Sequence, residues 1–251
     1  MPSTIAAQLF TLRDMLKTPA AIAATLKKVK QIGYEAVQVS GMGKIEPKEL
    51  AAILDGEGLA CCATHIPIEL MRDHASQVIE DHQLWKCRYT AIGSHHAASK
   101  ADWLKFAAEY NAIAARFDQC DLRIGYHNHS HELAHHDGTT ALQLLIDQLN
   151  ANVWMEIDTY WIVHGGGDPI QWIDKVRGRI PCVHLKDMAV TPDRTQLMAE
   201  VGEGNLNWPG ILAACRKAGV QWYIVEQDTC QRDPLESLAI SLRNLRQMGV
   251  Q

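Results

Sequence analysis

The chain has 251 residues, of which 47% are hydrophobic and 21% charged, and its 24 Lys and Arg against 29 Asp and Glu leave a formal net charge of −5. These proportions are typical of a globular domain and exclude a disordered, collagen-like or low-complexity protein. The mild acidity argues against a nucleic-acid-binding protein, which usually carries a basic face.

Short apolar runs alternate with helical patterns along the whole chain. Residues 5–10 form the first strand candidate, and a helix is expected at 19–32, with Pro19 in its first turn and Gly33 at its end. The other strands are expected at 36–40, 59–65, 88–93, 121–127, 153–158, 180–185 and 221–226. Their helices are expected from Pro47 to Gly56 or Gly58 and at 73–86, 100–117, 138–149, 169–176, 208–218 and 234–248. A long loop separates strand 180–185 from its helix.

This alternation indicates βαβ crossovers and a parallel sheet. Eight strand–helix units in a chain of this length predict one α/β domain over residues 1–251, a closed (β/α)8 TIM barrel. The rival fold is an open doubly wound sheet, which usually has a glycine-rich loop after its first strand. Here the first strand continues into TLRD, which favours the barrel.

The seven cysteines are scattered without a CxxC pair, which favours reduced thiols in a cytoplasmic protein over a secreted disulfide framework. The first residues, MPSTIAAQLFTLRD, lack the basic and long apolar regions of a signal peptide. No stretch reaches the roughly 18 apolar residues of a membrane span. We therefore expect a cytoplasmic protein with no membrane partner.

Polar side chains stand at the ends of five expected strands, where TIM barrels carry their chemistry. These residues are His65, His127, Asp158, His184 and Glu226. The last four end consecutive strands, so they should meet on one side of the barrel mouth, and such a mixture of His and carboxylates suits Mg²⁺, Mn²⁺, Fe²⁺, Co²⁺ or Zn²⁺. A single Asp there is more often a helix N-cap, and a single His a satisfied polar residue. The prediction of one shared metal site therefore depends on all four coinciding.

The segment 126–136, YHNHSHELAHH, contains five histidines. Alternation along an extended chain places His127 and His129 on the same side. His135 and His136 adjoin an expected turn at Gly138, and no role is assigned to them. Two residues near other strand ends have two interpretations each. Trp161 is an aromatic wall for a sugar ring or a core residue, and Lys186 binds an oxyanion or is solvated.

The C-terminal half resembles the xylose isomerase-like TIM-barrel superfamily, whose members are often called sugar phosphate isomerases/epimerases. The matching motifs are GYHNH at 125–129 with Glu132, EIDTYW at 156–161, VHLKD at 183–187, VGEGNLNW at 201–208 and YIVEQD at 223–228. The resemblance implies one divalent metal held by Glu, Asp, His and Glu on strands five to eight. Asp158, His184 and Glu226 match this pattern, but the strand-five Glu is missing. The fourth ligand is then His127, or the loop brings in Glu132 or His129.

The resemblance also implies a small carbohydrate substrate and proton abstraction next to a carbonyl, giving an isomerase or epimerase. Glu226 is the first choice for the base and Glu132 the second, while His65, Trp161 and Lys186 would contact substrate. Members with His-x-His at this place resemble dehydratases or lyases of keto-inositols and 3-keto-glycosides. For that alternative, His65 or His129 would protonate the leaving group. Family members are often dimers or tetramers, so the resemblance is also compatible with a homo-oligomer.

Three other functions are weighed against this one. An apurinic endonuclease of the same superfamily needs more metal ligands and a basic groove, which the net charge disfavours. A non-catalytic sugar-binding protein is disfavoured because Asp158, His184 and Glu226 are intact. A metal-free enzyme with a phosphate site would need a glycine-rich loop after strand seven or eight, and Gly202 and Gly204 are the only candidates there.

Overall fold

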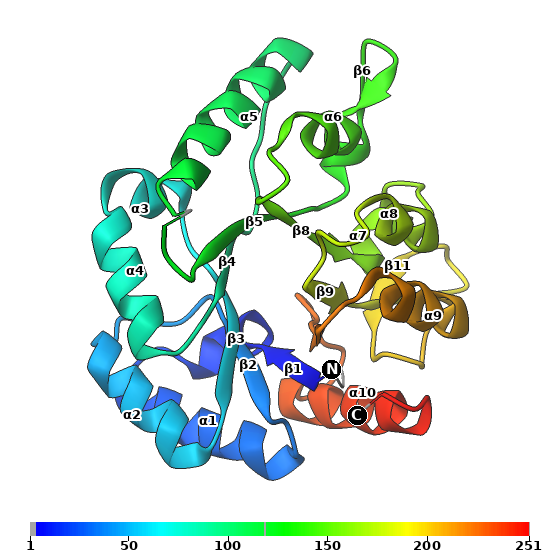
Figure 1. Cartoon of the computed structure of the whole chain (residues 1–251). Coiled ribbons are helices and arrows are strands. Elements are labelled where there is room, and N and C mark those ends of the chain that lie inside the picture. Colours follow the sequence, from blue (N-terminus) through cyan, green and yellow to red (C-terminus); the bar gives the residue numbers. More distant parts are fainter. Residues whose placement is uncertain (1–3, 118, 251) are drawn as a thin grey trace.

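The computed structural model describes residues 4–117 and 119–250 of the chain. Eight parallel strands form a closed barrel in the order β1-β12-β9-β8-β5-β4-β3-β2 (Figure 1). The strands are β1 (Thr4–Gln8), β2 (Ala36–Val39), β3 (Ala60–His65), β4 (Tyr89–Ile92), β5 (Arg123–His127), β8 (Trp154–Asp158), β9 (Cys182–Leu185) and β12 (Trp222–Val225). Parallel pairing of β1 with β12 closes the ring. The predicted (β/α)8 barrel is confirmed.

Helices surround this barrel on the outside (Figure 1). The main ones are α1 (Pro19–Ile32), α2 (Pro47–Glu57), α4 (Ala75–Leu84), α5 (Lys100–Ala115), α6 (Ala141–Gln148), α8 (Pro169–Lys175), α9 (Trp208–Ala218) and α10 (Pro234–Gln247). Shorter elements are the 3-10 helices η1 (Leu9–Met15) and η2 (His131–Leu133) and the helices α3 (Ile68–Asp73) and α7 (Thr159–His164). Two hairpins, β6 (His135–His136) with β7 (Thr139–Thr140) and β10 (Asp187–Val190) with β11 (Gln196–Ala199), lie outside the barrel sheet.

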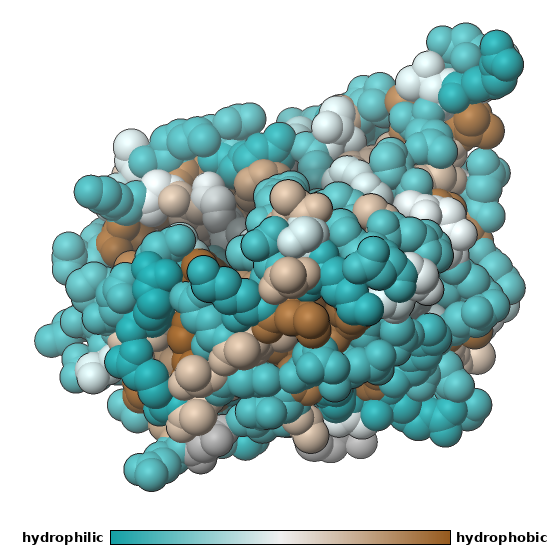
Figure 2. Space-filling view, turned by 90° about the horizontal axis from the view of Figure 1, so that it is seen from above, coloured by the Kyte–Doolittle hydropathy of each residue, from teal (hydrophilic) through white to brown (hydrophobic). Residues whose placement is uncertain are grey.

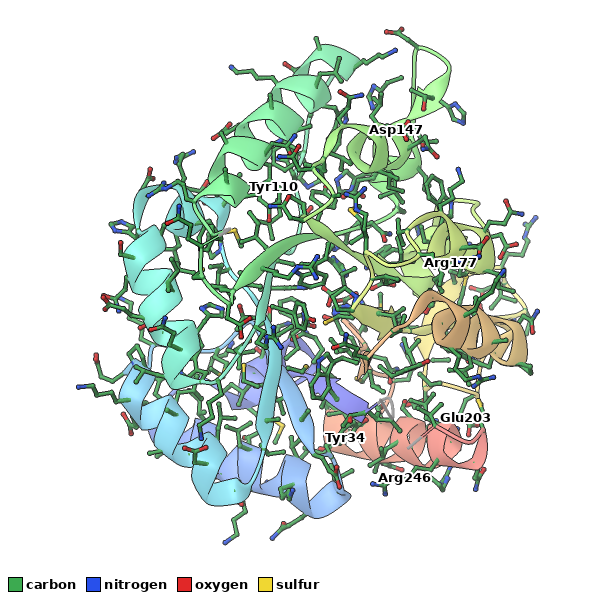
Figure 3. The ribbon with its side chains drawn as sticks, in the orientation of Figure 1. Tyr34, Tyr110, Asp147, Arg177, Glu203 and Arg246 are labelled. Carbon is green, nitrogen blue, oxygen red and sulfur yellow. The ribbon has the colours of Figure 1, made fainter. Side chains whose placement is uncertain are left out.

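The helix boundaries follow from local sequence. At the start of α1, the Thr18 side chain accepts a hydrogen bond from the backbone N–H of Ala21, and Pro19 occupies the first turn. Gly33 ends the helix with a φ of 112°, a left-handed conformation that favours glycine. The last helix then packs on the first, because the Tyr34 hydroxyl donates to the Leu238 carbonyl and Arg246 donates to the Gly33 carbonyl (Figure 3).

The barrel interior changes from apolar to polar along its axis. Small residues such as Ala6, Ala36 and Ala91 pack with the buried indole of Trp154 in the apolar part. Gly125 makes room for that indole, because a Cβ there would lie 2.4 Å from Trp154. Nearer the carboxyl ends of the strands, the inward-facing residues are polar and buried. The structure thus places a polar site at the mouth and a packed core beneath it.

Several predicted boundaries are wrong for identifiable reasons. The first strand ends at Gln8 rather than residue 10, because the chain turns into η1. The helix expected at 138–149 begins at Ala141, after a β6–β7 hairpin with positive φ at Asp137 and Gly138. Such an Asp-Gly pair favours a tight hairpin turn. His135 and His136 therefore form a short strand.

Other elements were missed by the helical and apolar patterns. The helix expected at 73–86 is α4, and a further helix, α3, precedes it and meets it at His74. A short helix, α7, follows β8 directly and had no counterpart among the expected elements. The long loop after 180–185 contains the antiparallel hairpin of β10 and β11.

The molecular surface is mainly hydrophilic. On the face in Figure 2, hydrophobic residues form small groups between hydrophilic ones. The large hydrophobic residues that are exposed are Leu70, Leu84, Leu104 and Val190. None of the helices in the described residues is long and apolar enough to span a membrane. All seven cysteines are free thiols, as their scattered positions predicted.

Candidate metal centre

The structure brings together the four side chains expected to bind a metal. His127 and Asp158 end β5 and β8, His184 is the last residue but one of β9, and Glu226 follows β12 directly. Each is buried, and each offers one donor atom within 4.8 Å of those of the others. Because these strands are neighbours in the barrel, their carboxyl ends supply one side of the mouth.

The distances within this cluster are short. His127 Nε2 lies 3.3 Å from Asp158 Oδ2. His184 Nδ1 lies 2.8 Å from Glu226 Oε2 and 3.6 Å from Asp158 Oδ2. Two imidazole nitrogens and two carboxylate oxygens thus face a common centre.

Two of these atoms lack a hydrogen bond although they are buried. His184 Nδ1 and Glu226 Oε2 lie 2.8 Å apart as an ion pair, but within the described chain neither atom has a partner with hydrogen-bond geometry. Buried polar atoms without partners are rare and call for an explanation such as an ion. A set of two imidazole and two carboxylate donors is also typical of Mn²⁺, Co²⁺, Fe²⁺ and Zn²⁺ sites. The residues present therefore fit a divalent cation.

Asp158 has two functions, one for each carboxylate oxygen. Oδ2 faces the cluster, whereas Oδ1 accepts a hydrogen bond from the backbone N–H of Trp161 and so caps α7. The Asp158 N–H donates to Asn128 Oδ1, which fixes the end of β8 beside β5. Both interpretations of an Asp at a strand end, N-cap and cluster member, therefore apply to this residue.

Glu156 lies beneath the cluster, and sequence reasoning did not include it among the site residues. Its Oε2 accepts a 2.5 Å hydrogen bond from His65 Nε2 and lies 3.3 Å from His184 Nε2. Its Oε1 accepts from Gln38 Nε2, and Gln38 Oε1 accepts from His184 Nε2 at 2.6 Å. Alternation along β8 could have revealed it, since Glu156 and Asp158 must face the same side.

The charges in this buried region stabilise one another. Burial raises the pKa of Glu156, but His184 and His65 outweigh it, so the pKa of Glu156 lies well below its usual value. Burial likewise opposes ionisation of Glu226, and Lys186 and His184 hold the pKa of that carboxyl low. Burial lowers the pKa of His184, but Glu156 and Glu226 raise it well above the usual value. Both carboxylates are therefore ionised at neutral pH.

Lys186 is buried rather than solvated, which corrects one of its two interpretations. Its side chain is only 1% exposed, and Nζ lies 3.0 Å from Asp158 Oδ2 and 2.8 Å from Glu226 Oε2. Burial favours the neutral amine, but the carboxylates of Asp158, Glu226 and Asp228 outweigh burial, so the pKa of Lys186 is raised. The ammonium group is thus part of the mouth.

Glu132, the second choice for the base, is not brought to the cluster. Its carboxylate accepts hydrogen bonds from the Tyr126 hydroxyl at 2.7 Å and from the backbone N–H of His129 at 2.9 Å. The Tyr126 ring lies outside the barrel sheet, against Phe106 of α5. Glu132 therefore holds the loop after β5 in place, and of the loop's two candidate replacements only His129 approaches the site.

His129 and Trp161 form part of the rim. The His129 ring lies 4.9 Å from that of His127, as strand alternation predicted, and 5.2 Å from Trp161. Burial, assisted by His127 and Lys186, lowers the pKa of His129 to about 2, which keeps the imidazole neutral. The buried His129 Nδ1 and Trp161 Nε1 have no hydrogen-bond partner among the described residues.

A cavity of about 150 Å³ adjoins the cluster. Its lining includes Phe10, Ser40, His65, His129, Lys186 and Glu226. A hydrophobic ring, a hydroxyl, two imidazoles and charged groups on one small cavity suit a polar ring compound. His65 therefore lines the cavity and at the same time bonds to the polar layer beneath it.

The glycine-rich loop after strand seven is already occupied by a side chain of the protein. The Asp187 carboxylate accepts hydrogen bonds from the backbone N–H groups of Gly202, Gly204 and Leu206. Trp208 Nε1 also donates to Asp187 Oδ2. These donors would be needed by a phosphate group, so the loop is closed around an internal anion instead.

Comparisons with known proteins agree with this architecture. A model of the xylose isomerase-like TIM barrel matches residues 26–248. No curated protein matches the chain. Among solved structures, a sugar phosphate isomerase/epimerase from Parabacteroides distasonis has a TM-score of 0.80 and 21% identity, covering 98% of this chain and 94% of its own.

Two further structures have other activities in their names. An L-ribulose 3-epimerase has a TM-score of 0.73 and 15% identity, covering 99% of this chain and 94% of its own. A probable 3-DHS dehydratase from Bacillus anthracis has a TM-score of 0.73 and 14% identity, covering 98% of this chain and 99% of its own. At these identities the likeness shows a shared fold.

Proposed function

The chain belongs to the xylose isomerase-like TIM-barrel family, and on this basis we propose that it is a metal-dependent isomerase or epimerase of a sugar or keto-sugar. The observation that carries the proposal is the meeting of four donor atoms from His127, Asp158, His184 and Glu226 beside a small polar cavity. A bound divalent cation would supply Lewis-acid stabilisation of negative charge on the oxygen of the substrate carbonyl.

The protein's own groups account for the remaining steps. The ionised Glu226 carboxylate accepts the proton from the carbon next to the carbonyl, the C–H electron pair forms the C=C bond, and the carbonyl oxygen becomes the enediolate oxygen. Return of this proton from Glu226 to the adjacent carbon gives an isomer. An epimer forms when solvent water on the other face donates a proton to the original carbon and the resulting hydroxide takes up the proton held by Glu226. Lys186 supplies positive charge on the cavity wall, where negative charge develops.

Substrate contacts are assigned to the rim. The Trp161 ring is half-buried at the mouth, with Lys186 Nζ 5.5 Å from its centre, and offers a flat apolar face to a sugar ring. His65 and Lys186 line the cavity and offer hydrogen-bond donors to hydroxyl groups. The cavity thus supplies polar contacts that fix orientation, and Trp161 would add a stacking surface beside Lys186 of its wall.

A second function, elimination of water from a keto-inositol or 3-keto-glycoside, is favoured by one observation. The neutral His129 lies at the rim with a buried Nδ1 that has no partner in the described structure. An imidazole N–H there would donate a hydrogen bond to a departing hydroxyl group, which leaves as water with the proton that Glu226 has taken from the neighbouring carbon. The same centre would then serve a dehydratase.

Solvent exchange tests the proposed reaction. The purified protein, loaded with Mn²⁺ or Co²⁺, is incubated in D₂O with ketohexoses, keto-inositols and 3-keto-glycosides. We expect deuterium at the carbon next to the carbonyl, observed by NMR, and loss of exchange in Glu226→Gln but not in Glu80→Gln, which changes an exposed carboxylate of α4. A product lacking one water assigns elimination, and the absence of exchange with every compound contradicts the proposal.

A further inference from the structure

Lys186 is shared by three carboxylates. Its Nζ lies 3.0 Å from Asp158 Oδ2, 2.8 Å from Glu226 Oε2 and 2.9 Å from Asp228 Oδ2. Two of these acids belong to the candidate ligand set, and Asp228 does not. Asp228 is also the most accessible of the three, with a side chain 24% exposed on the wall of the cavity.

The three contacts are not equivalent. Lys186 Nζ donates a hydrogen bond to Asp228, whereas Glu226 Oε2 has no hydrogen-bond donor in the described residues, although Nζ is close to it. The contact with Asp228 therefore has hydrogen-bond geometry, whereas the 2.8 Å contact with Glu226 is an ion pair. Asp228 lies two residues beyond Glu226, past the end of β12, and its greater exposure places it further out toward the open side of the mouth.

An ammonium group and a divalent cation compete for the same carboxylate oxygens. A hydrogen bond from Lys186 to the facing oxygen of Asp158 or Glu226 would use a lone pair and weaken the hold of that oxygen on a cation. The lysine side chain has a long flexible stem and rotatable donors, so its position depends on which acceptor is available. Without the charge of Asp228, its nearest anionic acceptors would be the two candidate ligands.

We propose that Asp228 is a positioning residue that binds the Lys186 ammonium on the open side of the cavity and so leaves Asp158 and Glu226 free for a divalent cation. This inference rests on the metal centre of the proposed function. Asp228 and Lys186 then act together: the Lys186 ammonium stays next to the metal ligands without taking the place of the metal ion.

Mn²⁺ binding to four variants tests the role of Asp228. Isothermal titration is performed on the chelator-treated full chain, on Asp228→Asn, on Lys186→Met and on the double variant. We expect Asp228→Asn to bind Mn²⁺ about 10–100-fold more weakly, the range typical of residues that support metal ligands. Lys186→Met should bind at least as tightly as the parent, and the double variant should regain the affinity of Lys186→Met. A merely structural role for Asp228 would not produce this recovery.

A surface pair provides the matched control. Asp14 and Lys17 form an exposed ion pair at 3.1 Å, and neither belongs to the cluster. Asp14→Asn should therefore leave the Mn²⁺ affinity unchanged. If Asp228→Asn binds Mn²⁺ as tightly as the parent, or if the double variant binds as weakly as Asp228→Asn, the proposed role of Asp228 is wrong. The metal centre itself is not contradicted by either result. Weaker binding in Lys186→Met also overturns the role of Asp228, even if Asp228→Asn does not fold. If the parent binds no Mn²⁺, both this inference and the metal centre fail.

Discussion

His65 Nε2 and Glu156 Oε2 lie 2.5 Å apart in the barrel interior, although 91 residues separate them along the chain. The same Glu156 oxygen lies 3.3 Å from His184 Nε2, and His184 presents Nδ1 to the cluster. A carboxylate behind an imidazole fixes the ring orientation and the nitrogen that is free to bind metal. Glu156 therefore supports the proposed centre from beneath.

Replacing this carboxylate should weaken metal binding without unfolding the chain. For Glu156→Gln we expect Mn²⁺ affinity to fall about 10–100-fold, because the charge that orients His184 is lost while the side-chain shape is kept. Isothermal titration measures the affinity, and circular dichroism checks the fold. Glu80→Gln should bind as the parent does. Equal affinities of parent and Glu156→Gln would show that Gln38 alone orients His184.

Two glycines of one helix should respond in opposite directions to alanine. Gly56 lies within α2, and a Cβ there meets no atom within 4 Å, so Gly56→Ala should raise the free energy of unfolding by about 0.5–1 kcal/mol. Gly58 ends the helix with a φ of 64°, and Gly58→Ala should lower it by about 1 kcal/mol. Urea unfolding measures both. A change of the same sign in both variants would contradict this account of the end of α2.

The loop at 202–208 should depend on the internal anion at Asp187. Asp187→Asn replaces an acceptor oxygen with an amide donor facing N–H groups, so we expect a loss of at least about 2 kcal/mol in unfolding free energy. Gly204→Ala should also destabilise, because its Cβ would lie 2.4 Å from Asp187 Oδ1. The exposed Asp193 is a control, and Asp193→Asn should change stability by less than about 0.5 kcal/mol. Losses for Asp187→Asn no larger than that would contradict the prediction.

His82 should make stability depend on pH. Burial behind β3 lowers the pKa of His82 to about 4, and its Nδ1 donates to the Val78 carbonyl while Nε2 accepts from the Thr64 hydroxyl. Because the unfolded chain binds this proton near pH 6.5, stability is complete above that pH and falls as the pH decreases toward 4. The total loss is on the order of 3 kcal/mol.

Urea unfolding at pH 7 and pH 4.5 measures this effect. His82→Gln should be less stable than the parent at pH 7, because it gives up the buried ring and its hydrogen bonds. Its stability should decline less than that of the parent between the two pH values. Parallel declines would show that His82 does not carry this part of the pH dependence.

The barrel was predictable because its signals are local. Each unit repeats an apolar run and a helical pattern, some helices also have capping residues, as at Thr18 and Gly33, and these features act within a few residues of the chain. The turn at Gly138 was also predicted from local sequence, but the following helix was expected to begin at that residue. The short strands β6 and β7 on either side of the turn were therefore missed.

The site was predictable in part for a geometric reason. Parallel strands end at one rim, so residues at strand ends converge whatever the loops do, and this rule located His127, Asp158, His184 and Glu226. The surroundings depend on contacts between distant segments. Burial of Lys186 among three acids depends on strands 42 residues apart in sequence, as its bond to Asp228 shows. No pattern within one segment reveals such a contact.

The two oxygens of Asp158 have a consequence for comparing relatives of this chain. One oxygen caps α7, so a descendant that had lost its chemistry would still be selected to keep aspartate there for the sake of the helix. Glu226 Oε2 instead lies 2.8 Å from both His184 Nδ1 and Lys186 Nζ, so its contacts are with the charged groups of the site. Among relatives that have lost the activity, we therefore expect substitution of the glutamate to be more frequent than substitution of the aspartate.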